Sequence, residues 1–343
     1  MTYAAIDLHK KESQIRIVCE TGEVIDRRVA TTRVCLTELF GGRPRIRVLL
    51  EASTESEWVA AHLETLGHEV VVADPNYTLM YGYRSRRIKT DQRDVAALTD
   101  ACRHGVYRPV HRRSTAQREV QAMLTVRQAV VQTRTRLISL ARALTRGAGL
   151  RLPSGHADSF RRRLLALEMP AALRAVLTPL VTVLTTVDAE LAAADARVVA
   201  QSAHDPQVQR LQTLPAIGPV TATAIVAALD TPARFASGAH VTSYVGLVPG
   251  EDSSAERQHR GHVVRSAQPH LRALLVQAAW RVWRSTAAEL AALRAWARHV
   301  AARRGKRIAV VALARRLMRI LFAMWRDARP FAPSALAAVA TRG

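Results

Sequence analysis

The stretch Tyr3-Ala-Ala-Ile-Asp7 is a short apolar run that ends in a carboxylate, and it decides the fold expected for the N-terminal third. A second run, Ile46-Arg-Val-Leu-Leu-Glu51, likewise places an acid directly after a β-type segment. Short apolar runs rich in β-branched residues are typical of buried strands. We therefore expect Asp7 and Glu51 to stand at the ends of two strands.

The surrounding pattern predicts an α/β layer with a mixed sheet. Strands are expected at five short runs: 3–8, 13–19, 24–30, 46–50 and 69–73. Thr21-Gly22 would turn the second strand into the third, and Asp74-Pro75-Asn76 would stop the last. Helices are expected at 32–42, 54–66 and 91–103.

Two further acids lie in Lys89-Thr-Asp-Gln-Arg-Asp94, where a spacing of three puts Asp91 and Asp94 on one face of a helix. Phosphodiester chemistry with Mg²⁺ needs hard oxygen ligands that can hold two ions close together. Asp7, Glu51, Asp91 and Asp94 therefore indicate a two-metal site. Any one of these acids alone is more often a turn residue or a helix N-cap, and Asp91 is itself a candidate cap.

The charge of the chain is unevenly distributed. The net charge is +22, and arginine supplies 46 of the 50 basic residues. Residues 1–110 carry a net charge of only +1, whereas residues 111–205 carry +7 and residues 206–343 carry +14. A cationic body with one acid-rich part favours nucleic acid as the partner. A GC-rich genome would also enrich arginine, so the arginine excess alone is weak support.

Cysteine usage and hydropathy favour the cytoplasm. Cys19, Cys35 and Cys102 show no CxxC or Cys/His spacing, which argues against a disulfide framework and a zinc site. No signal peptide is visible. The apolar segment 308–325 contains three arginines and is expected to be a basic amphipathic helix, not a membrane span.

The middle of the chain is predicted to be helical. Apolar residues recur at three- and four-residue steps over 123–144 and again over 180–198, the pattern of a coiled coil. The alternatives, a dimerising or interdomain coiled coil and simple packing onto its own domain, stay open. We expect domains at 1–110, 111–205 and 206–335.

In the C-terminal part, residues 211–229 resemble a helix-hairpin-helix, whose turn presents backbone N–H groups to a phosphate. Such modules usually carry glycine where Ala216 stands, so this hairpin is also compatible with a purely structural role. Further helices are expected at 237–245, 269–285, 286–303 and 306–326, between irregular segments.

Two other motifs are candidate binding or catalytic elements. The basic run Arg84-Ser-Arg-Arg-Ile-Lys89 leads into Asp91, which favours phosphate contacts over a merely solvated loop. Tandem serines follow a Pro-Gly turn in Gly246-Leu-Val-Pro-Gly-Glu-Asp-Ser-Ser-Ala255. On residues alone these serines are more simply loop residues than nucleophiles.

In order and spacing, these motifs resemble the DEDD transposases of the IS110 insertion-sequence family, relatives of the Piv-type DNA invertases. The resemblance rests on Asp7, Glu51 and Lys-Thr-Asp-x-x-Asp94, followed by Leu-Pro-x-Ile-Gly and Gly-Leu-x-Pro-x-x-x-x-Ser. It implies a RuvC-like (ribonuclease-H) N-terminal domain, a coiled-coil connection and a mainly α C-terminal transposase domain. It also implies Mg²⁺, two ions per site, on the four carboxylates.

The resemblance further implies a serine nucleophile that forms a phosphoserine bond to DNA. The family's serine falls on Ser254, with Ser253 as the fallback. Members use a structured bridge RNA that pairs with donor and target DNA, and they work as dimers or tetramers. The residues expected to contact nucleic acid are Arg84, Arg86, Arg87, Lys89, Arg257, Arg260 and Arg265. A bacterial cytoplasmic, nucleoid-associated enzyme is expected, without a membrane partner.

The chain departs from the family pattern in the C-terminal part. Ala255 stands where glycine often follows the nucleophile, and Val264-Arg-Ser-Ala-Gln-Pro-His270 replaces a Ser-Lys-x-Gly-Asn/His stretch. Two rival functions follow from the residues alone. One is a RuvC-like structure-specific nuclease that uses metal and water without a covalent intermediate, and the other is a non-catalytic basic nucleic-acid-binding protein.

Overall fold

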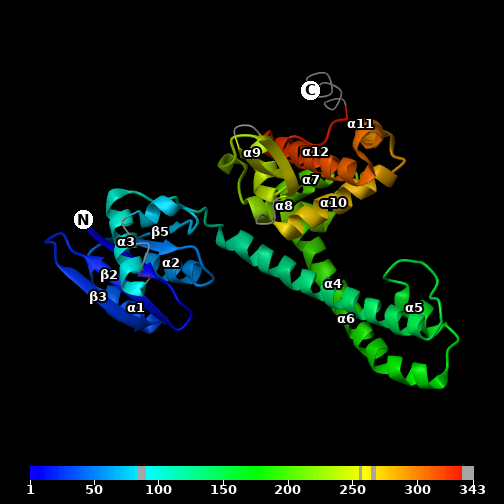
Figure 1. Cartoon of the computed structure of the whole chain (residues 1–343), viewed down its shortest axis with the longest axis horizontal. Coiled ribbons are helices and arrows are strands. Elements are labelled where there is room, and N and C mark those ends of the chain that lie inside the picture. The colour runs from blue at the N-terminus through cyan, green and yellow to red at the C-terminus, as the bar shows by residue number, and fades with distance from the viewer. Residues whose placement is uncertain (83–89, 255–256, 264–267, 334–343) are drawn as a thin grey trace. The chain divides into compact units, whose positions relative to one another are not determined.

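The computed structural model describes the chain except residues 83–89, 255–256, 264–267 and 334–343, and it describes 249–254 and 257–263 by their backbone only. The chain divides into two compact units, Met1–Arg113 and Ser114–Gly343. Figure 1 shows strands and helices mixed in the first unit and mainly helices in the second. The helices of the expected connector and those expected after it belong to the same unit.

The first unit is built on a five-stranded mixed sheet with the strand order β3-β2-β1-β4-β5. Its strands are β1 (Thr2–Asp7), β2 (Glu12–Val18), β3 (Val24–Ala30), β4 (Ile46–Glu51) and β5 (Glu69–Ala73). The first three form antiparallel pairs, whereas β1–β4 and β4–β5 are parallel. The expected α/β class and mixed sheet are confirmed, with strand limits within a residue or two of the prediction.

Helices cover both faces of this sheet. One core gathers Ile6 and Leu50 with residues of α1 (Arg33–Phe40) and α2 (Ser56–Thr65). The other gathers Ala5 and Leu49 with Met80 of the short helix η1 (Thr78–Tyr81) and with α3 (Asp91–His104). Because side chains alternate along a strand, neighbouring residues of β1 and β4 enter opposite cores.

Local turn chemistry explains where the elements of the first unit end. Gly22 has φ +87° between β2 and β3, a conformation that glycine adopts without steric cost. After β5, the Asp74 carboxylate accepts a hydrogen bond of 3.0 Å from the Asn76 backbone N–H, which turns the chain. The N-cap of α3 is Thr90, not Asp91, so the carboxylate of Asp91 has no capping role.

The second unit begins with two long helices, α4 (Thr115–Gly147) and α6 (Ala171–Ala203), which pack against each other and are joined through α5 (Phe160–Leu165). Two ion pairs show that the helices are antiparallel. Arg127 lies 2.5 Å from Asp195, and Arg134, one heptad later on α4, lies 2.8 Å from Asp188, one heptad earlier on α6. Figure 1 shows these helices as a hairpin.

The apolar stripe predicted on α6 faces inward, whereas the stripe predicted on α4 does so only in part, through residues such as Met123, Leu137 and Leu144. Leu184, Leu191 and Val198 are buried, whereas Val126 and Leu140 of α4 remain 63% and 49% exposed. The buried face of α4 does not coincide with the predicted apolar stripe, because it also carries the arginines that pair with acids of α6. Periodicity of apolar residues alone could not show that the contact is partly ionic.

Among the described helices, α6 is the one long and apolar enough to cross a membrane by length and composition. Only 22% of its most apolar window is buried in this chain. Asp188 and Asp195 on this helix are paired with α4 arginines, and such ion pairs are costly in hydrocarbon. The feature is therefore weak evidence for a span.

A compact helical core follows, made from α7 (Pro206–Gln212), α8 (Pro219–Leu229), α9 (Gly238–Val245), α10 (Pro269–Arg284), α11 (Ala291–Arg304) and α12 (Lys306–Arg326). The predicted basic amphipathic helix is α12, which buries Leu313, Leu317 and Leu321 in this core. The elements that were not expected include α5 and an antiparallel hairpin of β6 (Pro249–Ser254) and β7 (Arg257–Val263), which lies in a region predicted to be irregular.

The loop between α7 and α8 holds a strained residue. Ala216 has φ +85°, a left-handed conformation that costs a residue with a Cβ about 1 kcal/mol or more. Glycine, which similar hairpins usually carry at this place, would adopt it freely. The backbone conformation of the glycine-bearing turn is therefore retained although the glycine is absent.

We predict that Ala216→Gly raises the free energy of unfolding of the second unit by about 0.5–1 kcal/mol, because it relieves this strain. Denaturant unfolding followed by tryptophan fluorescence measures the change, since four of the five tryptophans lie in this unit. Ala189→Gly, at an exposed position inside α6, is the matched control and should destabilise by about 1 kcal/mol. A loss of stability in Ala216→Gly would contradict the account.

Candidate metal-binding site

Two carboxylates meet at the carboxyl-terminal edge of the sheet. Asp7 ends β1 and Glu51 ends β4, and the register pairs Ile6 with Leu50, one residue before each acid. Asp7 follows Ala5 on the strand face that α3 covers, and Glu51 follows Leu49 on the same face. Parallel pairing in this register therefore places both carboxylates on one side of one edge.

Helix α3 brings two more carboxylates to this place. Asp91 and Asp94 lie in its first turn, after the cap at Thr90, and their stripe continues through Val95 and Leu98, which are buried against the sheet. The side chain of Asp94 is buried, whereas that of Asp91 is 57% exposed. Carboxylates are also stabilised in a first helical turn by the helix dipole.

The electrostatics of Asp7 show that the other three acids lie close enough to influence it. Burial raises the pKa of the Asp7 carboxyl above its ordinary value, and the neighbouring negative charges of Glu51, Asp91 and Asp94 raise that pKa further. Only His9 acts in the opposite direction. Glu51, Asp91 and Asp94 thus all lie within electrostatic reach of Asp7.

A histidine that the sequence reasoning missed joins this cluster. His9 Nε2 lies 3.6 Å from Asp7 Oδ2 and 3.9 Å from Asp91 Oδ1. The candidate ligand atoms of Asp7, His9 and Asp91 all lie within 4.8 Å of one another. The position of His9 in the sequence could have indicated this place, because His9 follows β1 by only two residues and so remains near the carboxyl end of that strand.

Tyr81, which the sequence did not predict either, holds the carboxylate of Glu51 in place. Its hydroxyl donates a hydrogen bond to Glu51 Oε1, and burial together with this hydrogen bond raises the pKa of the phenol well above its usual range. Tyr81 therefore remains a donor at neutral pH and holds the Glu51 carboxylate in place. Groups that orient ligating carboxylates in this way strengthen metal sites.

The donor set fits a divalent cation. Within the described ranges of the chain, no lysine or arginine forms an ion pair with Asp7 or Asp91. A partly buried carboxylate such as that of Asp7 is costly to ionise unless cations neutralise it. Oxygen ligands from two strands and a helix suit a hard ion such as Mg²⁺, and Asp7, Glu51, Asp91 and Asp94 are the residues that would hold it.

The other predicted residues are placed only in part. Ser253 and Ser254 lie at the end of β6, where the register pairs Ser254 with Arg257 and Glu251 with Arg260. The backbone alone is described there. The remaining predicted contacts with nucleic acid lie outside the described residues: Arg84, Arg86, Arg87, Lys89 and Arg265.

The pKa of Asp7 predicts a pH-dependent gain from Asp7→Asn in the metal-free protein. Because folding raises this pKa, ionised Asp7 opposes folding at neutral pH, and the cost disappears as pH falls through the folded pKa toward the unfolded value near 3.8. Asp7→Asn should therefore raise the melting temperature in EDTA at pH 7, with less gain as pH approaches 4. The control is Asp26→Asn, which loses a 2.7 Å ion pair to Arg16 and should lower the melting temperature. Destabilisation by Asp7→Asn in EDTA would refute the argument.

The chain matches two family models. Residues 4–148 match a DEDD transposase domain of the IS110 type, and residues 208–294 match the transposase domain described as "Transposase IS116/IS110/IS902 family". The first match contains all four carboxylates of the cluster, and the second contains Ser253 and Ser254. The DEDD domain implies a divalent metal, in agreement with the donor set.

Similar full-length proteins are also transposases. A "Probable family 20 transposase" of Pseudomonas aeruginosa is 29% identical over 93% of this chain and 95% of its own length. The transposase of insertion sequence element IS1328 from Yersinia enterocolitica is 25% identical over the same shares of the two chains. That of element IS1111A from Coxiella burnetii is 27% identical over 69% of this chain and 66% of its own. Two domain models of the IS110 type match residues 4–148 and 208–294, and the first match contains the acidic cluster. The chain therefore belongs to the IS110 family of transposases.

Proposed function

We propose that this transposase cuts and rejoins DNA through a phosphoserine intermediate, with Mg²⁺ held by Asp7, Glu51, Asp91 and Asp94. The observation that carries the proposal is that Glu51, Asp91 and Asp94 lie near Asp7 at one edge of the sheet. When bound, the metal would polarise the scissile phosphate and stabilise the leaving oxygen. The mixed sheet, with an antiparallel β-hairpin beside parallel strands, supports a RuvC-like fold.

The protein's own residues would prepare this site in three ways. Tyr81 holds Glu51 by a hydrogen bond, and α3 presents Asp91 and Asp94 from a rigid first turn. His9 lies at the exposed rim, where it can accept or donate a proton close to Asp7 and Asp91. Burial of Asp94 and half-burial of Glu51 limit the water that could compete with a DNA oxygen.

In the second unit, Ser254 would supply the nucleophile. Its Oγ would attack the phosphorus, lose its proton, and displace one DNA hydroxyl, leaving a phosphodiester between serine and the other strand end. A hydroxyl of the partner DNA would then reverse the step, so no external energy source is required. The place of Ser254 at the end of β6, paired with Arg257 of β7, supports this assignment.

In-line attack requires Ser254 to reach the phosphate held at the acidic edge. The acids and the serine belong to different units, so a second copy of the chain could supply one half of the site. The α4–α6 hairpin would then act as the coiled coil that joins dimers or tetramers. The exposed apolar residues Val126 and Leu140 on α4 support a partner at this hairpin.

The sequence of the DNA target would be selected by a structured bridge RNA that pairs with donor and target DNA. The net charge of +7 in residues 111–205 and +14 in residues 206–343 supports binding of phosphate backbones. Sequencing of the RNA that copurifies with the protein tests this part of the proposal. A single discrete structured RNA is expected, and a featureless mixture of cellular RNA would contradict guidance.

Covalent trapping tests the chemistry. With Mg²⁺ and a DNA substrate deduced from the bridge RNA, the wild type should yield labelled DNA that stays attached to protein in SDS. Ser254→Ala should abolish the adduct, and Ser253→Ala should retain it. Asp91→Asn should reduce both cleavage and adduct by at least about 100-fold, because a ligand to the metal is lost.

The matched control for Asp91→Asn is Asp100→Asn, which changes an acid on the same helix outside the cluster and should leave activity unchanged. Cleavage without any adduct, unaffected by Ser254→Ala, would favour the structure-specific nuclease. An adduct that persists in Ser254→Ala and disappears in Ser253→Ala would move the nucleophile to Ser253.

A further inference from the structure

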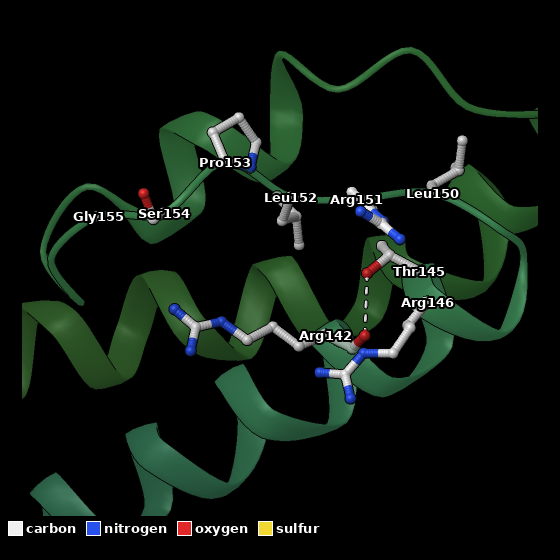
Figure 2. Close-up of a pocket in the computed structure, with 9 residues that line it drawn as sticks. All are labelled: Arg142, Thr145, Arg146, Leu150, Arg151, Leu152, Pro153, Ser154 and Gly155. Atoms are coloured by element: carbon white, nitrogen blue, oxygen red, sulfur yellow. Dashed lines mark hydrogen bonds between the residues drawn. The ribbon is translucent and has the colours of Figure 1, made fainter.

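The tip of the α4–α6 hairpin contains a cavity of about 680 Å³ that lies far along the chain from both catalytic motifs. It is formed by the last turns of α4 and the loop leading to α5. Figure 2 shows Arg142 and Arg146 projecting from α4 and Arg151 descending from the loop toward the same helix. The residues that line it are Arg142, Thr145, Arg146, Leu150, Arg151, Leu152, Pro153, Ser154 and Gly155.

The cavity concentrates positive charge. Arg142 and Arg146 are one turn apart on α4, so their like charges repel each other, and Arg151 adds a third cation. Over residues 134–174 the chain has nine arginines and only two acids. One of these acids, Asp158, is paired with Arg134 at 2.7 Å. Within the part of the hairpin that is described, no acid is ion-paired with the three arginines of the cavity.

The wall of the cavity is held in place by further contacts. Arg163 donates hydrogen bonds to the backbone carbonyls of Pro153 and His156, the second at 2.7 Å, and so fixes the loop. A Cβ at Gly155 would lie 2.9 Å from Arg163 Cζ, so glycine allows this close approach. The guanidinium groups of Arg142 and Arg163 lie 5.5 and 5.9 Å from the ring centroid of buried Phe160.

This packing restricts the orientation of Arg142 within the arginine cluster. A stacked guanidinium loses little entropy when an anion binds, because its orientation is already restricted. Three cations that repel one another around one cavity are stabilised by a shared anion. Leu150, Leu152 and Pro153 add apolar surface to the lining, and in Figure 2 the side chain of Leu152 points toward α4.

We propose that this cavity binds the phosphodiester backbone of the nucleic acid on which the transposase acts, with Arg142, Arg146 and Arg151 as its phosphate contacts. Arginine forks match phosphate oxygens in pairs, and the apolar wall can lie against an adjoining sugar or base. DNA and RNA share this chemistry. The inference rests on the proposed use of nucleic acid, but it adds a contact that is distant in sequence from the catalytic residues.

The test compares two triple variants of the full-length protein. The pocket variant is Arg142→Gln/Arg146→Gln/Arg151→Gln. The matched control, Arg136→Gln/Arg162→Gln/Arg197→Gln, removes the same charge from exposed positions of the same hairpin outside the cavity. Fluorescence anisotropy measures binding of labelled duplex DNA, single-stranded DNA and an RNA hairpin over a range of NaCl concentrations. Circular dichroism verifies that both variants are folded.

The pocket variant should bind at least one probe about tenfold more weakly than the control variant. Its slope of log Kd against log salt should also fall by about one unit for each lost phosphate contact. The probe that loses most identifies the natural ligand as DNA or RNA. Equal losses in both variants would overturn the proposal, because net charge alone would then explain them.

A second measurement locates the contact directly. Oligonucleotides with 4-thiouridine or 4-thiothymidine, crosslinked to the wild type, should label peptides from residues 142–155, and absence of label there would overturn the proposal. These outcomes are separable from failure of the catalytic proposal. Binding is measured without Mg²⁺, and Asp91→Asn should bind the probes as well as the wild type even though it cannot cleave.

Discussion

The parallel pairing of β1 with β4 is the constraint on which the functional part of the structure depends. This register, Ile6 beside Leu50, brings Asp7 and Glu51 to the same edge and the same face of the sheet. The burial of Val95 and Leu98 then locks α3 onto that face, so that Asp91 and Asp94 meet the strand-end acids. A shift by one residue would turn either strand-end acid toward the other core. Hydrophobic burial of the strands and of α3 thus holds these acids together, and the pKa of Asp7 is raised first by its own burial and then by the neighbouring negative charges.

The sequence predicted the first unit well because its signals are local. Apolar runs, glycine-bearing turns and the spacing of three between Asp91 and Asp94 determine elements over a few residues. It did not predict Tyr81 or the inward face of α4, because these depend on partners distant in sequence, and His9 was missed although it follows Asp7 by only two residues. Tyr81 meets an acid 30 residues away, and Arg127 meets one 68 residues away. The hairpin of β6 and β7 was missed because its polar residues lack the alternation typical of a half-buried strand.

Under the proposed function, the two units would divide the chemistry of a transposase between them. The nearly neutral first unit can hold cations because its acids are gathered, whereas the cationic second unit can hold phosphates because its arginines outnumber its acids. Within the second unit, the positive charge of residues 111–205 is concentrated at the tip of the α4–α6 hairpin, in residues 134–174. Ala216 keeps a left-handed backbone conformation, although a glycine at this position would relieve the strain.

The central claim is that four carboxylates at one sheet edge form a single divalent-metal site. Titration with Mn²⁺ followed by electron paramagnetic resonance tests it most directly, because the free ion gives a signal that disappears on binding. The wild type should remove Mn²⁺ from solution at the site, and Mg²⁺ should displace it. Asp94→Asn, which replaces the most buried acid by its isostere, should weaken binding about 10–100-fold or more. Equal Mn²⁺ affinity in the wild type and Asp94→Asn would contradict the account.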